Sequence, residues 1–391
     1  MRRRSFLSMT ASLALAPLAG RIGAQTPTAP STTDVMALLR LVPDDALKVP
    51  WYVRYADYGL QLSTMGIGSD RANLEFDTWI DAVRELNVPS AMERAPSDPL
   101  WRDSFGFDVR DIDLLLELTT VSTSITIMHG AIGMLTPARL RLMGYEPVET
   151  SGVTWYTIGD VNLLETDHYI HVLHLGYLRH VALLDDRTVV GTSDTTAMEQ
   201  VLALHAGGPG SFAEGRGASL ISEPPGLVSA TIVDGTELVP TLDSDTVARL
   251  PEAEGMTEEQ IEAHVSQVRE HVARMPPIDL ALLGLTAGRM RGEVPGPAAR
   301  SRAVAVIVPS DPVDAEMVAE TITRRLTTET VPESALIGER SWVDAFPVMD
   351  IDTAPGGERV VVTLTPADDV PSNRLIHLLW RRDLSLFFWI E

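Results

Sequence analysis

The sequences VRYAD at residues 53–57 and TIVD at residues 231–234 decide the fold that we predict for this chain. Each is a short, largely apolar run that ends in aspartate, which is typical of a strand followed by a turn. A linker, a longer helix, an extended segment and a second helix are predicted to follow each of them. The order strand, helix, strand, helix, strand thus occurs twice, with a period far too long for a solenoid. This order predicts two similar lobes packed side by side.

The fold class that we predict is α+β. Each lobe is expected to be a small mixed or antiparallel sheet with helices packed on one face. Residues 112–128 alternate between apolar and polar side chains, which predicts a strand with one buried side. Residues 180–192 predict a hairpin that turns at Asp185 and Asp186.

The chain divides into five segments on the basis of its composition. Residues 207–226 contain six glycines and three prolines, so they are the best candidate for a linker between the lobes. We therefore predict an N-terminal lobe at 34–206 and a C-terminal lobe at 227–391. Residues 25–33, a run of Thr, Pro and Ser, read as a flexible leader. Residues 1–24 precede it.

The N-terminal segment carries a recognisable order of residue types. Arg3 and Arg4 are followed, after one residue, by Phe6 and Leu7, and then by an apolar stretch and a small-residue cleavage site that ends at Ala24. This order resembles the twin-arginine export signal, whose family crosses the membrane already folded. The resemblance implies the twin-arginine export machinery as a partner and a periplasmic, cell-wall-associated or extracellular destination. The signal is expected to be cleaved; retention as an anchor is the alternative.

The charge of the chain excludes several partners. The sequence has 31 Lys and Arg against 54 Asp and Glu, a net charge of −23. Cleavage after Ala24 would remove four arginines and no acid, which leaves 27 basic residues and a net charge of −27. Such a surface repels phosphate backbones and anionic lipid headgroups, so nucleic acid is excluded as a partner.

Missing residue types exclude further classes of site. There is no cysteine, so thiolate zinc sites, iron–sulfur clusters, c-type haem and cysteine nucleophiles are ruled out. Lys48 is the only lysine, and it lies in neither a phosphate-binding loop nor a Ser-x-x-Lys motif. The Gly-x-Ser-x-Gly elbow is also absent. We predict no cofactor. The longest uncharged stretch, residues 119–138, lacks the leucine density of a membrane span, so no stable span is expected in the mature chain.

One segment holds the strongest candidates for a metal site. The candidate ligands are Glu165, Asp167, His168, His171 and His174. Imidazole and carboxylate groups are the ligands that zinc, copper or nickel would need without cysteine. Their spacing is poor, because on a strand His168 and His174 share a face while His171 points the other way. The alternative is a set of ordinary polar residues on a half-exposed strand or loop, with His180 close behind.

Acidic and aromatic residues form further groups. The carboxylates cluster at Asp108, Asp111 and Asp113, at Asp243 and Asp245, and at Asp350 and Asp352. None of these groups has the glycine and distal glutamate of a calcium loop, so we predict that they cap turns. Aromatic side chains crowd residues 51–58, where they either line a groove or pack between layers.

Two functional classes remain open. The missing catalytic motifs favour a non-enzymatic exported protein that binds a ligand or a partner in the cell envelope or outside the cell. The alternative is an extracytoplasmic hydrolase or metal-dependent enzyme that uses the region from His168 to His174.

Overall fold

The computed structural model describes most of the segment between the first helix and residue 370. The described residues are 32–44, 51–64, 67, 74–83, 86, 99–120, 122–150, 152–158, 177–215, 217, 220, 226–235, 255–272, 276–287, 301–327, 341–354 and 358–370. They combine helices with antiparallel strands, which confirms the predicted α+β class.

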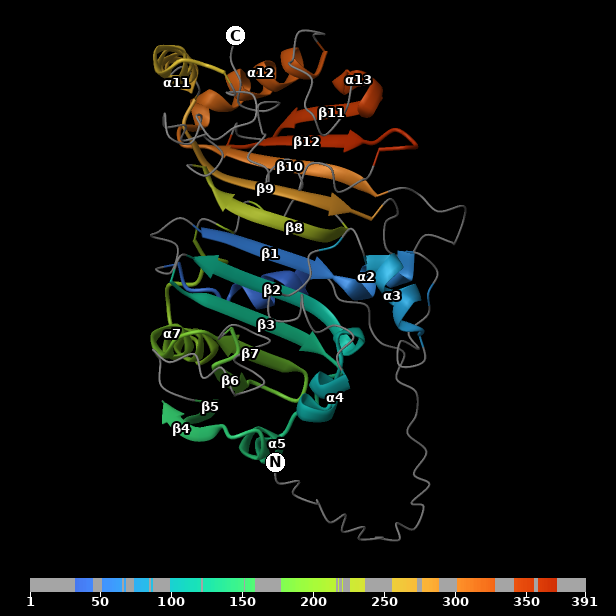
Figure 1. The fold of residues 1–391 in the computed structure, drawn as a ribbon, viewed down its shortest axis with the longest axis vertical. Helices are drawn as coiled ribbons and strands as arrows, with labels where there is room; N and C mark the ends of the chain where they lie inside the picture. Colours follow the sequence, from blue (N-terminus) through green and yellow to red (C-terminus); the bar gives the residue numbers. More distant parts are fainter. Residues whose placement is uncertain are drawn as a thin grey trace.

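The described strands form one twelve-stranded antiparallel sheet, which runs along the whole length of the molecule (Figure 1). In spatial order the strands are β11 (Val348–Thr353), β12 (Val360–Thr365), β10 (Arg302–Pro309), β9 (Ile278–Thr286), β8 (Leu227–Asp234), β1 (Trp51–Asp57), β2 (Ile112–Thr120), β3 (Ser124–Gly130), β7 (Thr188–Thr192), β6 (His180–Leu183), β5 (Val153–Thr157) and β4 (Glu146–Thr150).

The described helices lie in the connections between these strands. The α-helices are α1 (Thr32–Leu39), α2 (Tyr58–Thr64), α3 (Phe76–Val83), α4 (Pro99–Phe105), α5 (Pro137–Leu142), α7 (Thr195–His205), α11 (Glu258–Val272), α12 (Ala315–Thr327) and α13 (Trp342–Ala345), with 3-10 turns η4 (Val109–Asp111) and η6 (Pro312–Asp314). None of the helices in the described ranges is long and apolar enough to cross a bilayer.

The two strands that decided the predicted fold are neighbours in the middle of the sheet. β1 and β8 pair antiparallel, with Arg54 opposite Thr231. Among the described strands, this is the single pairing that connects those of residues 51–192 with those of residues 227–365. The sheet is therefore continuous across the middle of the chain, where we expected two small sheets.

Both faces of the sheet are buried, because successive side chains of its strands enter two separate hydrophobic clusters. Helices α1 and α7 cover one face, which we call the α1/α7 face. Helices α2 to α5, α12 and α13 cover the other, which we call the α2/α12 face. The expectation that helices pack on one face was wrong, because strands such as Ile278–Thr286 are apolar on both sides and need cover on both.

The single strand predicted at residues 112–128 is two strands, β2 and β3, joined by a tight turn. The prediction that this segment has only one buried side was also wrong, because Thr126 and Ile127 point to opposite faces and both are fully buried. The hydroxyl of Thr120 makes the turn by accepting hydrogen bonds from the backbone N–H groups of Ser122 and Thr123, at 3.2 and 2.9 Å. By contrast, the hairpin predicted at residues 180–192 is confirmed as β6 and β7.

Of the predicted linker, residues 207–215, 217, 220 and 226 are described. Gly210 accepts a hydrogen bond from the backbone N–H of Asp44, and the Phe212 ring packs edge-on against Trp51 with centroids 5.8 Å apart. The division of the chain at this segment stays a prediction.

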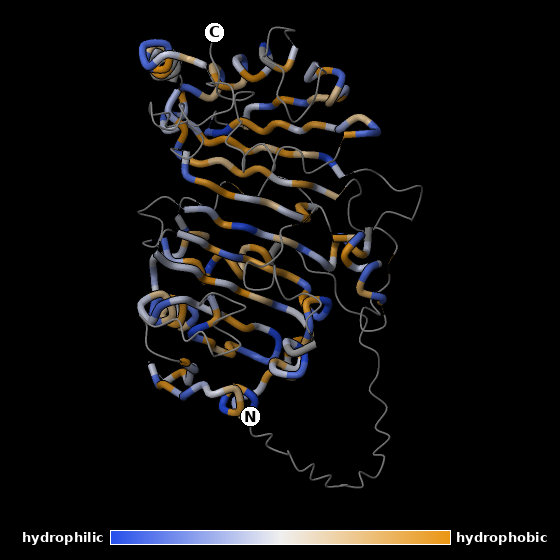
Figure 2. The backbone as a smooth tube through the Cα atoms, in the orientation of Figure 1, coloured by the Kyte–Doolittle hydropathy of each residue, from blue (hydrophilic) through white to orange (hydrophobic). Residues whose placement is uncertain are grey.

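The centre of the sheet contains a buried ion pair. Arg54 of β1 and Glu117 of β2 are directly opposite each other, and the guanidinium Nη2 lies 2.5 Å from the carboxylate Oε2. The Glu117 side chain is fully buried, and 10% of the Arg54 side chain is exposed. These charges lie among strands whose residues are otherwise mostly hydrophobic (Figure 2). Removing either partner alone would leave the other charge without this contact in a region of low dielectric.

Replacing Glu117 alone should therefore lower the stability of the fold. We expect Glu117→Leu to lower the free energy of unfolding by about 3 kcal/mol, measured by urea denaturation. The double variant Arg54→Met with Glu117→Leu should lose distinctly less, because no buried charge remains. Equal losses in the single and double variants would show that the ion pair does not govern the stability of this region.

The two outer strands carry residues that discourage pairing with another chain. Pro147 and Glu149 are on β4, and Asp350 and Asp352 are exposed on β11. Proline lacks a donor, and charges on an edge repel an incoming strand. The aspartate pair singled out in the sequence therefore lies on an edge strand, not in a turn.

Neutralising this edge should promote association. We expect Asp350→Thr with Asp352→Thr to shift the chain toward larger species than the native protein at equal concentration, measured by size-exclusion chromatography with light scattering. The control Glu259→Gln with Glu262→Gln removes two exposed charges from helix α11 and should leave the mass unchanged. If both variants associate equally, net charge and not the edge is responsible.

Candidate functional site

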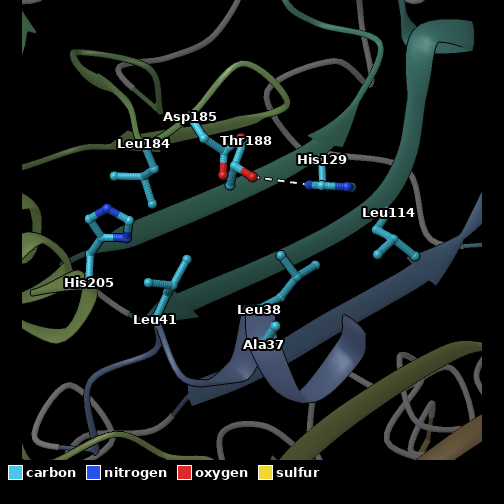
Figure 3. A pocket seen from close by; sticks show the side chains of 9 residues that line it. All are labelled: Ala37, Leu38, Leu41, Leu114, His129, Leu184, Asp185, Thr188 and His205. Carbon is cyan, nitrogen blue, oxygen red and sulfur yellow. Dashed lines mark hydrogen bonds between the residues drawn. The ribbon is translucent and has the colours of Figure 1, made fainter. Parts of the chain in front are cut away.

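A pocket on the α1/α7 face is the clearest candidate for a binding site in the described part of the chain. It has a volume of about 270 Å³ and opens to solvent. We call it the α1/α7 pocket, and Figure 3 shows the side chains around it. Its lining residues are Ala37, Leu38, Leu41, Leu114, His129, Leu184, Asp185, Thr188 and His205.

The floor of the pocket comes from the register of three adjacent strands. Leu114 of β2 is the partner of His129 of β3, which in turn is the partner of Thr188 of β7. Their side chains therefore share the α1/α7 face. The His129 Nδ1 and the Thr188 Oγ1 are hydrogen-bonded at 3.0 Å, as the dashed line in Figure 3 marks. This contact fixes the orientation of the imidazole ring.

Helix α1 forms one wall because its apolar side chains pack on the sheet. Val35, Leu38 and Leu39 are buried in the cluster of that face, which fixes the helix against β2. Ala37 is exposed and Leu41 is partly buried, so both border the open space. The wall is thus apolar and its backbone is held by core packing.

The hairpin turn between β6 and β7 forms the opposite wall with Leu184 and Asp185. The Leu184 N–H donates to the Thr188 carbonyl at 3.0 Å, and the Asp185 carboxylate accepts from the Arg187 N–H at 2.7 Å. The Arg187 guanidinium donates to Asp113 at 2.7 Å, which ties the turn to β2. These bonds keep the wall in place.

His205 completes the pocket from the end of helix α7, where its side chain is exposed. In Figure 3 it stands on the opposite side of the space from His129. The pocket is therefore lined mostly by apolar side chains, with polar groups on its floor (His129 and Thr188) and at its border (Asp185 and His205). No group of three or more His, Asp or Glu residues that could hold a metal ion occurs among the residues that the structure describes.

The residues singled out for a metal site are not among the described ones. Glu165, Asp167, His168, His171 and His174 lie in residues 159–176, outside the described residues. The same holds for Asp243 and Asp245, and for the signal residues Arg3, Arg4, Phe6, Leu7 and Ala24. The metal hypothesis and the export signal stay predictions.

The remaining sequence candidates have structural roles. The Asp108 carboxylate accepts from the Arg110 N–H at 2.7 Å, and the Asp111 carboxylate accepts from the Asp108 N–H at 2.8 Å, which is a reciprocal cap of η4. This confirms the prediction that Asp108 and Asp111 cap a turn. Of the aromatic group, Trp51 and Tyr55 are buried on the α1/α7 face, so they pack between layers.

His180, which follows the candidate metal segment, is buried in β6. Its Nδ1 is hydrogen-bonded to the Thr157 Oγ1 at 2.9 Å, and its ring meets Trp155 edge-on. Burial, with a smaller effect of the Arg179 charge, lowers the pKa of the imidazole to about 4, while Asp194 acts in the opposite direction. His180 is therefore neutral at pH 7.

The lowered pKa of His180 predicts a loss of stability in acid. A histidine in the unfolded chain has a pKa near 6.5, so the stabilisation is complete above that pH and is lost as the pH falls toward 4. We expect His180 to account for about 2 kcal/mol of lost unfolding free energy over this range, measured by urea denaturation at a series of pH values.

Two variants isolate this effect. His180→Gln should be less stable than the native chain at pH 7 but should lose less stability on acidification, because glutamine does not titrate. His205→Gln, at an exposed position, should keep the native pH dependence. If His180→Gln had the native slope between pH 6.5 and 4, another group would be responsible.

The residues of the α1/α7 pocket were missed because they are separated in the sequence. His129 lies near the end of one strand, Thr188 begins another and His205 ends a helix, so no spacing links them. Comparison with known proteins adds no information, because no family model, curated protein or solved structure matches the chain.

Proposed function

We propose that this chain is an exported, non-enzymatic binding protein that takes a small amphipathic ligand in the α1/α7 pocket. The observation that carries the proposal is a preformed space of about 270 Å³ with a mostly apolar interior and polar groups on its floor and border. Binding sites for small molecules typically combine such an interior with a few fixed polar groups. The export signal at residues 1–24 belongs to the same proposal.

The size of the pocket limits the ligand. An apolar cavity of roughly 150 Å³ holds benzene, so the α1/α7 pocket has room for a molecule nearly twice that size. The apolar body of the ligand would pack against Leu38, Leu41 and Leu184. Its polar group would hydrogen-bond with Thr188 on the floor or with Asp185 at the border. The exposed Asp185 carboxylate favours a neutral or cationic group over an anionic one.

The arrangement of the strands supports the two similar lobes that the sequence predicts, and we include them in the proposal. β1, β2 and β3 are successive antiparallel neighbours, and so are β8, β9 and β10. In each half a later strand, β7 or β12, returns to the outer side of the third strand. The α1/α7 pocket belongs to the first half, so binding there does not require the second.

Filling the pocket should abolish binding. We expect Ala37→Trp to weaken the binding of 2-phenylethanol and 2-phenylethylamine at least tenfold, because the indole would occupy the space. Isothermal titration and ligand-observed NMR measure the affinities. Arg40→Trp is the matched control, since residue 40 is exposed near the end of α1 but does not line the pocket. Equal affinity in Ala37→Trp and the native chain would exclude this pocket.

A panel of substrates tests the alternative that the protein is an enzyme. The purified protein should turn over no member of a panel of ester, peptide, glycoside and phosphate substrates. Turnover that survives Ala37→Trp would favour the hydrolase or metal enzyme and refute a purely binding role.

A further inference from the structure

The charges around the α1/α7 pocket narrow the class of ligand that it can take. Asp185 is the only carboxylate among the nine described residues that line the pocket. His129 and His205 are the other ionisable groups of the lining, and histidine side chains are ordinarily neutral well above pH 7. Under those conditions the lining carries one formal charge, and that charge is negative.

The turn between β6 and β7 holds the Asp185 carboxylate at the border of the pocket. One of its oxygens accepts the Arg187 N–H at 2.7 Å, which is the hydrogen bond of an Asx turn. The side chain is exposed, and Figure 3 shows it on the same side of the space as Thr188. A carboxylate has about four acceptor positions, so this single bond leaves room for a donor from a ligand.

The arginine of the same turn is paired elsewhere. The Arg187 guanidinium donates to the Asp113 carboxylate at 2.7 Å and to the Gly130 carbonyl at 3.4 Å. The positive charge nearest in the sequence is therefore matched by Asp113 and not by Asp185. The whole chain adds to the effect of Asp185, because a net charge of −23 attracts cations from solution and repels anions.

Thr188 supplies a second acceptor on the floor of the pocket. Its hydroxyl is hydrogen-bonded to the His129 Nδ1 at 3.0 Å. A hydroxyl has one donor and two acceptor lone pairs, so this bond leaves at least one lone pair whichever histidine tautomer is present. A primary ammonium has three donors and no acceptor, and it can donate to a carboxylate and to a hydroxyl at the same time.

We propose that the ligand of the α1/α7 pocket is a small primary amine in its ammonium form with an apolar body, and that Asp185 determines this selectivity. The inference rests on the proposed function, because it names the ligand class of the same pocket. The ammonium would donate to Asp185 and Thr188 while the apolar body packs against Leu38, Leu41 and Leu184. Hydrogen bonds to an ionised partner are stronger than neutral ones, so the amine is preferred over an alcohol of equal size.

Two ligands with the same apolar body test the proposal on the full chain. We expect the native protein to bind 2-phenylethylamine about fivefold more tightly than 2-phenylethanol at pH 8 and low salt, the upper end for an exposed ion pair. Asp185→Asn should remove this preference by weakening the amine alone, measured by isothermal titration. The asparagine oxygen can still accept the Arg187 N–H, so the melting temperature should be unchanged.

Asp186→Asn is the matched control, because it removes the same charge from the neighbouring exposed residue, which does not line the pocket. It should keep the preference for the amine. The inference is overturned if the native chain binds amine and alcohol equally, if phenylacetate binds more tightly than either, or if Asp185→Asn keeps the preference. Its loss in both variants would assign it to net charge and also overturn the inference.

Failure of this inference and failure of the proposed function give different results. If 2-phenylethanol binds and Ala37→Trp abolishes that binding, the pocket is a binding site even where the amine is not preferred. If neither ligand binds the native chain, or if Ala37→Trp binds both as tightly as the native chain does, the proposed function fails and the inference fails with it.

Discussion

The antiparallel pairing of β1 with β8 is the constraint on which the rest of the described structure depends. Among the strands that the structure describes, it is the single connection between those before and those after residues 207–226. Because side chains alternate along a strand, a shift of this register by one residue would move every side chain of one half to the opposite face. The positions of both hydrophobic clusters, of the helices that cover them and of the buried Arg54–Glu117 pair all follow from this register.

Because both faces of the sheet are buried, the charged residues in its centre need partners within the protein. A sheet with one solvated face would expose Arg54 and Glu117, and they would need no partners. Here helices cover both faces, so each charge is buried and is neutralised by its cross-strand neighbour.

Much of the fold could be predicted from local patterns, and the errors have identifiable physical causes. The hairpin at residues 180–192 was found because Asp185 and Asp186 are typical turn residues. The hairpin of β2 and β3 was missed because its turn uses the Thr120 hydroxyl and contains no Gly, Pro, Asn or Asp. The α+β class was predictable. The burial of both faces was not predicted, although strands such as Ile278–Thr286 are apolar on both sides and need cover on both.

The candidate site was less predictable than the fold. The α1/α7 pocket combines residues from α1, α7 and four strands or turns, and only the register of β2, β3 and β7 brings Leu114, His129 and Thr188 together. The buried ion pair has the same origin, since Arg54 and Glu117 are 63 residues apart. Such arrangements arise from long-range pairing, which leaves no spacing to recognise in one sequence.

The β1–β8 pair also determines which strand each half accepts as its neighbour. An antiparallel pair has a local two-fold axis, so its geometry alone would allow two copies of β1 from different molecules to meet in the same way. The two strands have different outer neighbours. Arg54 of β1 is the cross-strand partner of Glu117 of β2, whereas Thr231 of β8 is the cross-strand partner of Leu283 of β9. A β1–β1 pairing in this register would face guanidinium against guanidinium, which is repulsive. The sequence therefore disfavours the pairing of β1 with a second copy of β1 and favours its pairing with β8.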